Sequence, residues 1–215
     1  FTFYTFYQCH NIVCLYFCVK IIIMNYSIYA ESTPNPEVMK FVSNRMLSSK
    51  NIEIKNTKEA KGISIAEELL KFPFVKSIYL SSNFISISKK EAINWEDIAM
   101  PLRTFISEHL NNHEIQDYAK NISNKEKLKE IKNEQKKFNE DEQEIEKILK
   151  EYIAPAVESD GGSITLKYYK NNIVCVNLQG ACSGCPASTS TLKGGIENLL
   201  KQKINPNIEV ISNEE

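Results

Sequence analysis

Cys182 and Cys185 are the residues of this 215-residue chain whose type and spacing point most clearly to chemistry. They stand in the run Gln-Gly-Ala-Cys-Ser-Gly-Cys-Pro, and two thiolates at this spacing can bind one metal centre. The same spacing also occurs in redox-active dithiols and in cysteines that only pack in a core. The secondary structure predicted around the pair helps to distinguish these three possibilities.

The cysteine pair is predicted to lie on a loop that leaves a strand and enters a helix. Pro186 follows the second cysteine directly and suits the first position of a helix. The amide groups and the positive dipole end of such a helix favour a thiolate at Cys185 and any anionic group bound there. Gly180 and Gly184 allow a tight path and a close approach of the backbone to sulfur.

Residues 140–215 predict one small domain around this loop, in the order α-β-β-α-β. Apolar residues from Ile145 to Val157 recur at helical spacing, and Pro155 is expected to end or bend that helix. Ser163 to Lys170 and Ile173 to Leu178 predict a hairpin. Ile208 to Ile211 can add an edge strand. The helix after the loop carries an apolar stripe of Leu192, Ile196, Leu199, Leu200 and Ile204.

Residues 24–111 predict a second small domain with a ββαββα-like order. Two extended stretches flank a Pro/Asn turn at residues 33–36, and a hairpin is expected over residues 75–88, in which Ile85 and Ile87 alternate with serines. His109 and His113 are interpreted as surface residues, because no cysteine or carboxylate completes a metal site beside them. The predicted fold class is therefore α+β, with two small α/β-sandwich domains joined by a charged linker.

Two segments fall outside these domains. Residues 112–139 are rich in Lys and Glu without Gly or Pro, which predicts a linker, either disordered or a solvated helix. Residues 1–23 are aromatic and β-branched with Lys20 as their one fixed charge, and the favoured interpretation is that Met24 is the true start. A membrane anchor and a degenerate targeting segment are the alternatives for residues 1–23.

The composition excludes some classes of function. A formal net charge of −1 argues against a nucleic-acid binder that works through bulk positive charge. No stable membrane association is expected. Thiolates that bind metal must stay reduced, which predicts the cytoplasm of a bacterium or, as the alternative, a mitochondrial or plastid compartment of a eukaryote.

The ligand count predicts a partner chain. Common iron–sulfur clusters take four cysteines, and Cys182 and Cys185 supply two. Cys175 lies on a regular strand and points with Ile173 and Asn177, so it is interpreted as structural. The simplest completion is a homodimer in which two loops meet around one cluster. A thioredoxin-like dithiol and a zinc site between chains remain as alternatives.

The chain resembles the Nfu-type iron–sulfur cluster scaffolds. The resemblance rests on residues 158–164, on the run from Leu178 to Pro186 and on residues 191–197, which are similar to the NifU C-terminal domain of that family. The stretch from Ala30 to about Leu110, with its Ser-Thr-Pro-Asn-Pro run and Trp95, is similar to the N-terminal domain of one branch.

The resemblance implies a carrier and not an enzyme. Such a protein binds a [4Fe–4S] cluster, or a [2Fe–2S] cluster as the alternative, bridged between two protomers by Cys182 and Cys185 of each. It receives the cluster from the assembly machinery and delivers it to apo iron–sulfur client proteins. The N-terminal domain would help to recognise those clients.

Overall fold

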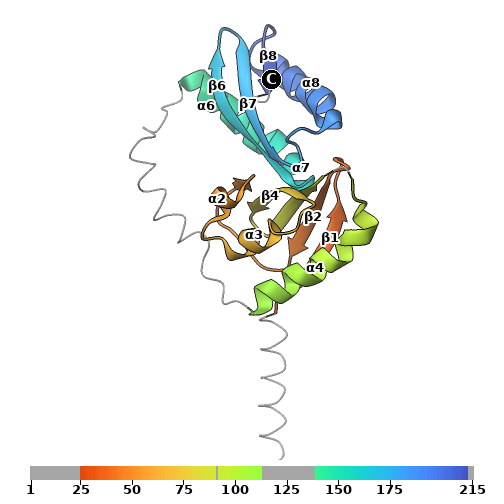
Figure 1. Cartoon of the computed structure of the whole chain (residues 1–215). Helices are drawn as coiled ribbons and strands as arrows, with labels where there is room; N and C mark the ends of the chain where they lie inside the picture. The colour runs from red at the N-terminus through yellow and green to blue at the C-terminus, as the bar shows by residue number, and fades with distance from the viewer. Residues whose placement is uncertain (1–24, 91, 113–138, 213–215) are drawn as a thin grey trace, which may run out of the picture.

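The computed structural model describes residues 25–90, 92–112 and 139–212. The predicted segment 1–23 and linker residues 113–138 lie outside the described residues. Two sheets, each with its own helices, make up the described part of the chain (Figure 1). This confirms the α+β fold class.

The N-terminal domain is built on a five-stranded antiparallel sheet in the order β1-β2-β5-β4-β3. Its strands are β1 (Ile28–Ser32), β2 (Val38–Ser43), β3 (Ile52–Ile54), β4 (Val75–Ser81) and β5 (Phe84–Lys89). Its helices are α2 (Thr57–Ala60), α3 (Ser64–Leu69) and α4 (Trp95–Asn112). The predicted ββαββα-like order lacked β3 and α2, because a three-residue strand and a one-turn helix are too short to produce a periodic pattern.

One face of the N-terminal sheet forms a hydrophobic core with α3 and α4. Residues on alternate positions of β5, Ile85 and Ile87, point into this core and are almost fully buried. His109 of α4 is also buried, and its Nε2 lies 2.9 Å from Ser64 Oγ. The prediction of a surface histidine was therefore wrong for His109, because α3 packs over that turn of α4. His113 lies outside the described residues.

The C-terminal domain has the predicted order α-β-β-α-β. Strands β6 (Gly162–Lys170) and β7 (Ile173–Gly180) form an antiparallel hairpin, and β8 (Glu209–Ser212) pairs with β7 in parallel. Asn171 and Asn172 both have positive φ, which is the conformation that a two-residue hairpin turn requires. Helix α8 (Pro186–Lys203) begins at the predicted proline.

The first helix of this domain continues past Pro155. It runs as α6 (Glu140–Ile148), a π-helical segment η1 (Leu149–Ile153) and α7 (Ala154–Ser159). Pro155 has no N–H to donate to the preceding turn, and the wider π turn directly before it accommodates that loss. Pro155 thus changes the register of the helix and does not end it.

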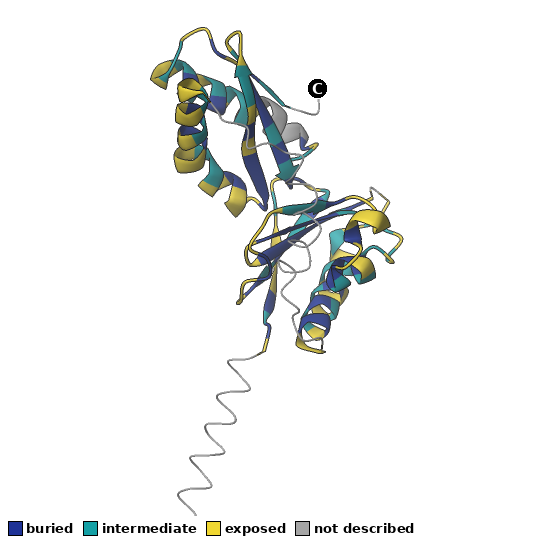
Figure 2. Ribbon diagram, turned by 90° about the vertical axis from the view of Figure 1, so that its left-hand side faces the viewer, coloured by how far each residue is buried: buried dark blue, intermediate teal, exposed yellow. Residues whose placement is uncertain are grey.

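The outer surfaces of the helices are exposed, whereas strands β4, β5 and β7 are mostly buried (Figure 2). No helix in the described ranges has the length and apolar character needed to cross a membrane.

Candidate functional site

The cysteine pair lies on the loop between β7 and α8, as predicted. Gly180 ends the strand with φ +67° and Gly184 precedes Cys185 with φ +64°, so both use the left-handed region that glycine tolerates best. The amide of Ser183 donates a hydrogen bond to the carbonyl of Gly180 at 3.2 Å, which closes a tight turn around Cys182. The loop therefore holds both cysteines at the start of α8.

Both cysteines are buried. Cys182 is 5% exposed and Cys185 is 2% exposed. Cys182 belongs to the same core cluster as Val157, Ile196 and Leu200. Cys182, one of the two candidate ligands, therefore packs as a core residue.

Burial also changes the acidity of Cys182. Burial, together with smaller contributions from the nearby Asp160 and Cys185, raises the pKa of Cys182 to about 12. At neutral pH Cys182 is a neutral thiol that has to lose a proton before it can bind metal.

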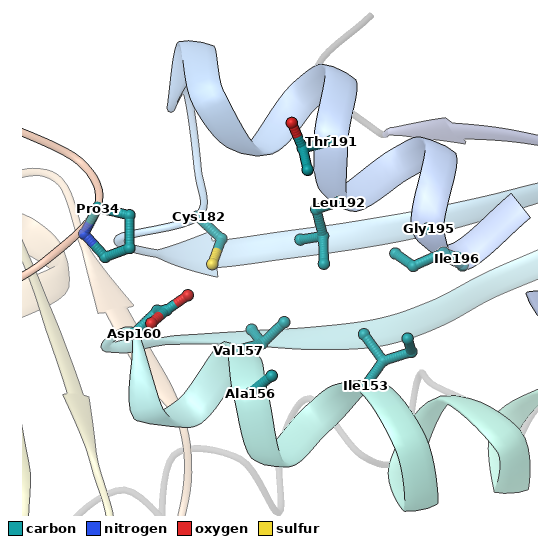
Figure 3. A pocket seen from close by; sticks show the side chains of 10 residues that line it. All are labelled: Pro34, Ile153, Ala156, Val157, Asp160, Cys182, Thr191, Leu192, Gly195 and Ile196. Carbon is teal, nitrogen blue, oxygen red and sulfur yellow. The ribbon is translucent and has the colours of Figure 1, made fainter.

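Cys182 faces an apolar cavity of ≈ 420 Å³ (Figure 3). Asp160 and Val157 line the cavity from α7 and the turn after it, and Leu192 lines it from α8. Pro34, which belongs to the N-terminal domain, completes one wall. The sulfur of Cys182 points into this space in Figure 3, toward the side of Asp160.

Cys175 lies apart from the pair. Its neighbours Val174 and Val176 on β7 point into the core that contains Cys182. Because side chains alternate along a strand, Cys175 points to the opposite face of the sheet. In residues 25–90, 92–112 and 139–212 no group of three or more His, Cys, Asp or Glu side chains could hold a metal ion. The described part of one chain thus offers Cys182 and Cys185 alone as a paired thiol site.

The Pro/Asn turn of the N-terminal domain contacts the cysteine loop, which the sequence did not indicate. Asn35 is 4% exposed, and its Nδ2 donates a hydrogen bond to the carbonyl of Ala181 at 3.0 Å. Its Oδ1 accepts from the amide of Glu37 at 3.0 Å, so the side chain is fixed at both ends. A single asparagine between two prolines was the available signal, because prolines restrict the backbone on both sides of it.

The chain matches two family models. One, described as "Scaffold protein Nfu/NifU N terminal", covers residues 28–113, and the other, described as "NifU-like domain", covers residues 145–211. The first includes Asn35 and the N-terminal sheet. The second includes Cys182 and Cys185.

Proteins from animals are similar to most of this chain. The chain is 33% identical over 195 residues to the mitochondrial NFU1 iron–sulfur cluster scaffold homolog of Drosophila willistoni, with 86% of this chain and 62% of that protein covered. It is 28% identical over 188 residues to the protein of the same name from Homo sapiens, with 85% of this chain and 69% of that protein covered. The chain thus spans less than two thirds of the Drosophila protein.

Part of the chain is also similar to a solved structure. The solution structure of a NifU-like protein from Saccharomyces cerevisiae is 30% identical, with 42% of this chain and 82% of that chain covered and a TM-score of 0.38. The two matched models account for both described domains, and the cysteine pair lies inside the second. The chain therefore belongs to the Nfu-type family, in which an Nfu N-terminal domain is followed by a NifU-like domain.

Proposed function

We propose that this protein carries a [4Fe–4S] cluster as cargo, bound between two copies of the chain. Cys182 and Cys185 of each copy would supply the four thiolates that such a cluster takes. The observation that carries the proposal is a pair of thiols on a strand-to-helix loop with no third metal ligand grouped beside them in the described residues. The match to a NifU-like domain over this loop supports the same assignment.

The cargo would be passed to apo iron–sulfur proteins by ligand exchange. In each step a client thiolate forms a bond to one iron as the bond between that iron and a cysteine of the carrier breaks. The proton lost by the client thiol is balanced by the proton that the released cysteine takes up. No substrate is turned over, so the proposed role is that of a scaffold and not of an enzyme.

Partners and compartment follow from the relatives. The Drosophila and human proteins are named as mitochondrial iron–sulfur cluster scaffolds, which supports a mitochondrial compartment for this chain, with the bacterial cytoplasm as the alternative. The cluster assembly machinery would load the carrier and apo client proteins would unload it. We further propose that residues 24–111 and 140–215 act as separate units, with client recognition assigned to the first.

Anaerobic reconstitution tests the proposal. The protein is incubated with iron and sulfide, and iron, sulfide and molecular mass are then measured on the brown product. Four irons and four sulfides per dimer are expected. Cys182→Ser and Cys185→Ser should each lose the cluster, while Cys175→Ser, the matched control, should keep it because Cys175 lies on the other face of the sheet.

Other outcomes would overturn parts of this proposal. Two irons per dimer would change the cluster type to [2Fe–2S]. A colourless protein with stoichiometric zinc would replace the cluster with a structural metal. A full cluster on a monomer would exclude the bridged arrangement.

A further inference from the structure

A row of side chains crosses the N-terminal sheet on the face opposite its helices. Strand pairing places Glu31, Lys40, Ser86, Tyr79 and Glu53 directly beside one another on β1, β2, β5, β4 and β3. None of them belongs to the hydrophobic core on the other face. Alternation along a strand would normally leave such a polar row in water. Ser86, however, is 1% exposed and Tyr79 is 2% exposed.

The cysteine end of the C-terminal domain covers this row (Figure 1). Ser86 Oγ donates a hydrogen bond to the carbonyl of Gly161 at 2.6 Å, and Lys40 Nζ donates one to the carbonyl of Ser159 at 2.9 Å. Asn35 adds the third, to the carbonyl of Ala181. All three donors are side chains of the N-terminal domain, and all three acceptors are main-chain carbonyls close to Cys182.

Two glycines of the C-terminal domain make this approach possible. A Cβ at Gly161 would lie 2.8 Å from Ser86 Oγ, and a Cβ at Gly180 would lie 2.8 Å from Cδ1 of Tyr79. These distances are shorter than real Cβ contacts allow. The absence of side chains at both positions thus serves the contact between domains as well as the turn of the cysteine loop.

The contact has the features of a reversible interface. The hydrogen bonds described above join polar groups, as is typical of interfaces between domains of one chain. A second cavity of ≈ 430 Å³ also remains between the domains, and it is lined by residues that include Asn35, Ser88, Gly180 and Gly184. The ring of Tyr79 lies against Gly180, and its hydroxyl is buried without a hydrogen-bond partner in the described part of the chain. A buried hydroxyl without a partner is unfavourable, so separation of the domains would return it to water.

We infer that this face of the N-terminal domain, formed by Asn35, Lys40, Ser86 and Tyr79, is a docking surface for the cysteine loop of its own chain and for the neighbouring turn at residues 159–161. The inference rests on the proposed cluster shared between two chains. Asn35 is hydrogen-bonded to the carbonyl of Ala181, and Pro34 lines the cavity that Cys182 faces, so a second loop cannot approach Cys182 from this side in this arrangement. The N-terminal domain must therefore release the loop before the cluster is shared.

Thiol labelling of the full-length apoprotein tests the inference. The rate at which a bulky maleimide modifies Cys182 and Cys185 is followed by peptide mass spectrometry, and it reports how often the loop is released. Ser86→Ala and Asn35→Ala remove one hydrogen bond each and should raise the rate about fivefold, and the double variant about 25-fold. Cluster loading should become faster in the same order.

Two further variants distinguish release of the loop from misfolding and from a general effect of substitution on this face. Tyr79→Phe removes the hydroxyl without a partner and should slow labelling about threefold, which a merely misfolded protein would not do. Ser88→Ala changes a serine on the same face of β5, two residues from Ser86, and should label like the wild type. Circular dichroism should show the same secondary structure in all variants.

The outcomes separate this inference from the proposed function. Labelling rates that do not differ between Ser86→Ala, Asn35→Ala and wild type would overturn the docking surface, even if four irons per dimer still bind. If labelling changes as expected but no cluster forms, the docking surface stands and the carrier function fails. Concentration-dependent protection of the thiols would show that a second copy occupies the surface and would overturn docking within one chain.

Discussion

The two cores of this protein differ in what they contain. The N-terminal core consists of aliphatic and aromatic residues on a five-stranded sheet, and no cysteine takes part in it. The C-terminal core lies on a three-stranded sheet and includes Cys182, the proposed cluster ligand. Under the proposed function, packing and cluster binding would compete for the side chain of Cys182 in the C-terminal domain.

The largest expected effects come from matched leucine substitutions, one in each core, which should lower stability equally but differ in the cluster retained. Leu69 and Leu200 are both fully buried, one in each core. Leu→Ala at either position should lower the free energy of unfolding by about 3 kcal/mol, measured by urea denaturation. Leu200→Ala should also reduce the amount of cluster retained, since α8 anchors the cysteine loop, whereas Leu69→Ala should retain it. Equal cluster loss in both variants would contradict the separation of the two cores.

Two glycines in the cysteine loop offer a second comparison, between backbone strain with a steric conflict and backbone strain alone. Gly180 and Gly184 have nearly the same positive φ, but a Cβ at Gly180 would lie 2.6 Å from the carbonyl oxygen of Gly161, while a Cβ at Gly184 meets nothing within 4 Å. Gly184→Ala should cost about 1 kcal/mol of unfolding free energy through backbone strain alone. Gly180→Ala should cost about 3 kcal/mol, because it adds a steric conflict.

This glycine pair is its own control. If the two alanine variants unfold at the same urea concentration, the close contact at Gly180 does not contribute to stability.

Alkaline pH should weaken the C-terminal core selectively. The folded-state pKa of Cys182, about 12, is higher than its ordinary value of 9.0. Because the folded state favours the neutral thiol, ionisation of Cys182 destabilises it relative to the unfolded chain. The contribution of Cys182 to stability is therefore unaffected below pH 9 and is lost as pH rises from 9 toward 12. The loss should reach about 2 kcal/mol by roughly pH 10.5, measured by urea denaturation at several pH values.

Cys182→Ala provides the reference for this pH effect. Its unfolding free energy should fall less steeply between pH 9 and about pH 10.5 than that of the wild type. Parallel curves would show that the thiol of Cys182 ionises as easily in the folded protein as in the unfolded chain.

Surface ion pairs should give the smallest differences. Lys71 and Glu68 pair at 2.5 Å on the N-terminal surface, and Lys71→Ala should change the unfolding free energy by less than about 0.5 kcal/mol. Glu197 on α8 pairs with Lys201 and also accepts a hydrogen bond from the amide of Val210 at 3.1 Å. Glu197→Ala should therefore cost more, about 1 kcal/mol. Thermal melts of both variants check this order, and the reverse order would contradict it.

Local patterns predicted most of the elements. The hairpin at Asn171-Asn172, the start of α8 at Pro186 and the stripe that includes Ile196 and Leu200 all follow from residue type and short spacing. The short strand β3 and the burial of His109 did not, because they depend on β4 and on α3, which are distant in the sequence. The continuation of the helix past Pro155 did not either, because it depends on a π turn that the apolar spacing does not indicate.

Residue patterns were enough to predict the α+β class, the order of elements in the C-terminal domain and the loop on which the two cysteines lie. These depend on local propensity and on contacts between residues close in the chain. The tertiary structure was needed to show that Cys182 is a buried, neutral thiol, that Asn35 binds the cysteine loop and that Ser86 binds the turn at Gly161. The hydrogen bonds of Asn35 and Ser86 span 75 to 146 residues of chain, and the burial of Cys182 depends on how α7 and α8 pack around it, so no short-range pattern records these properties.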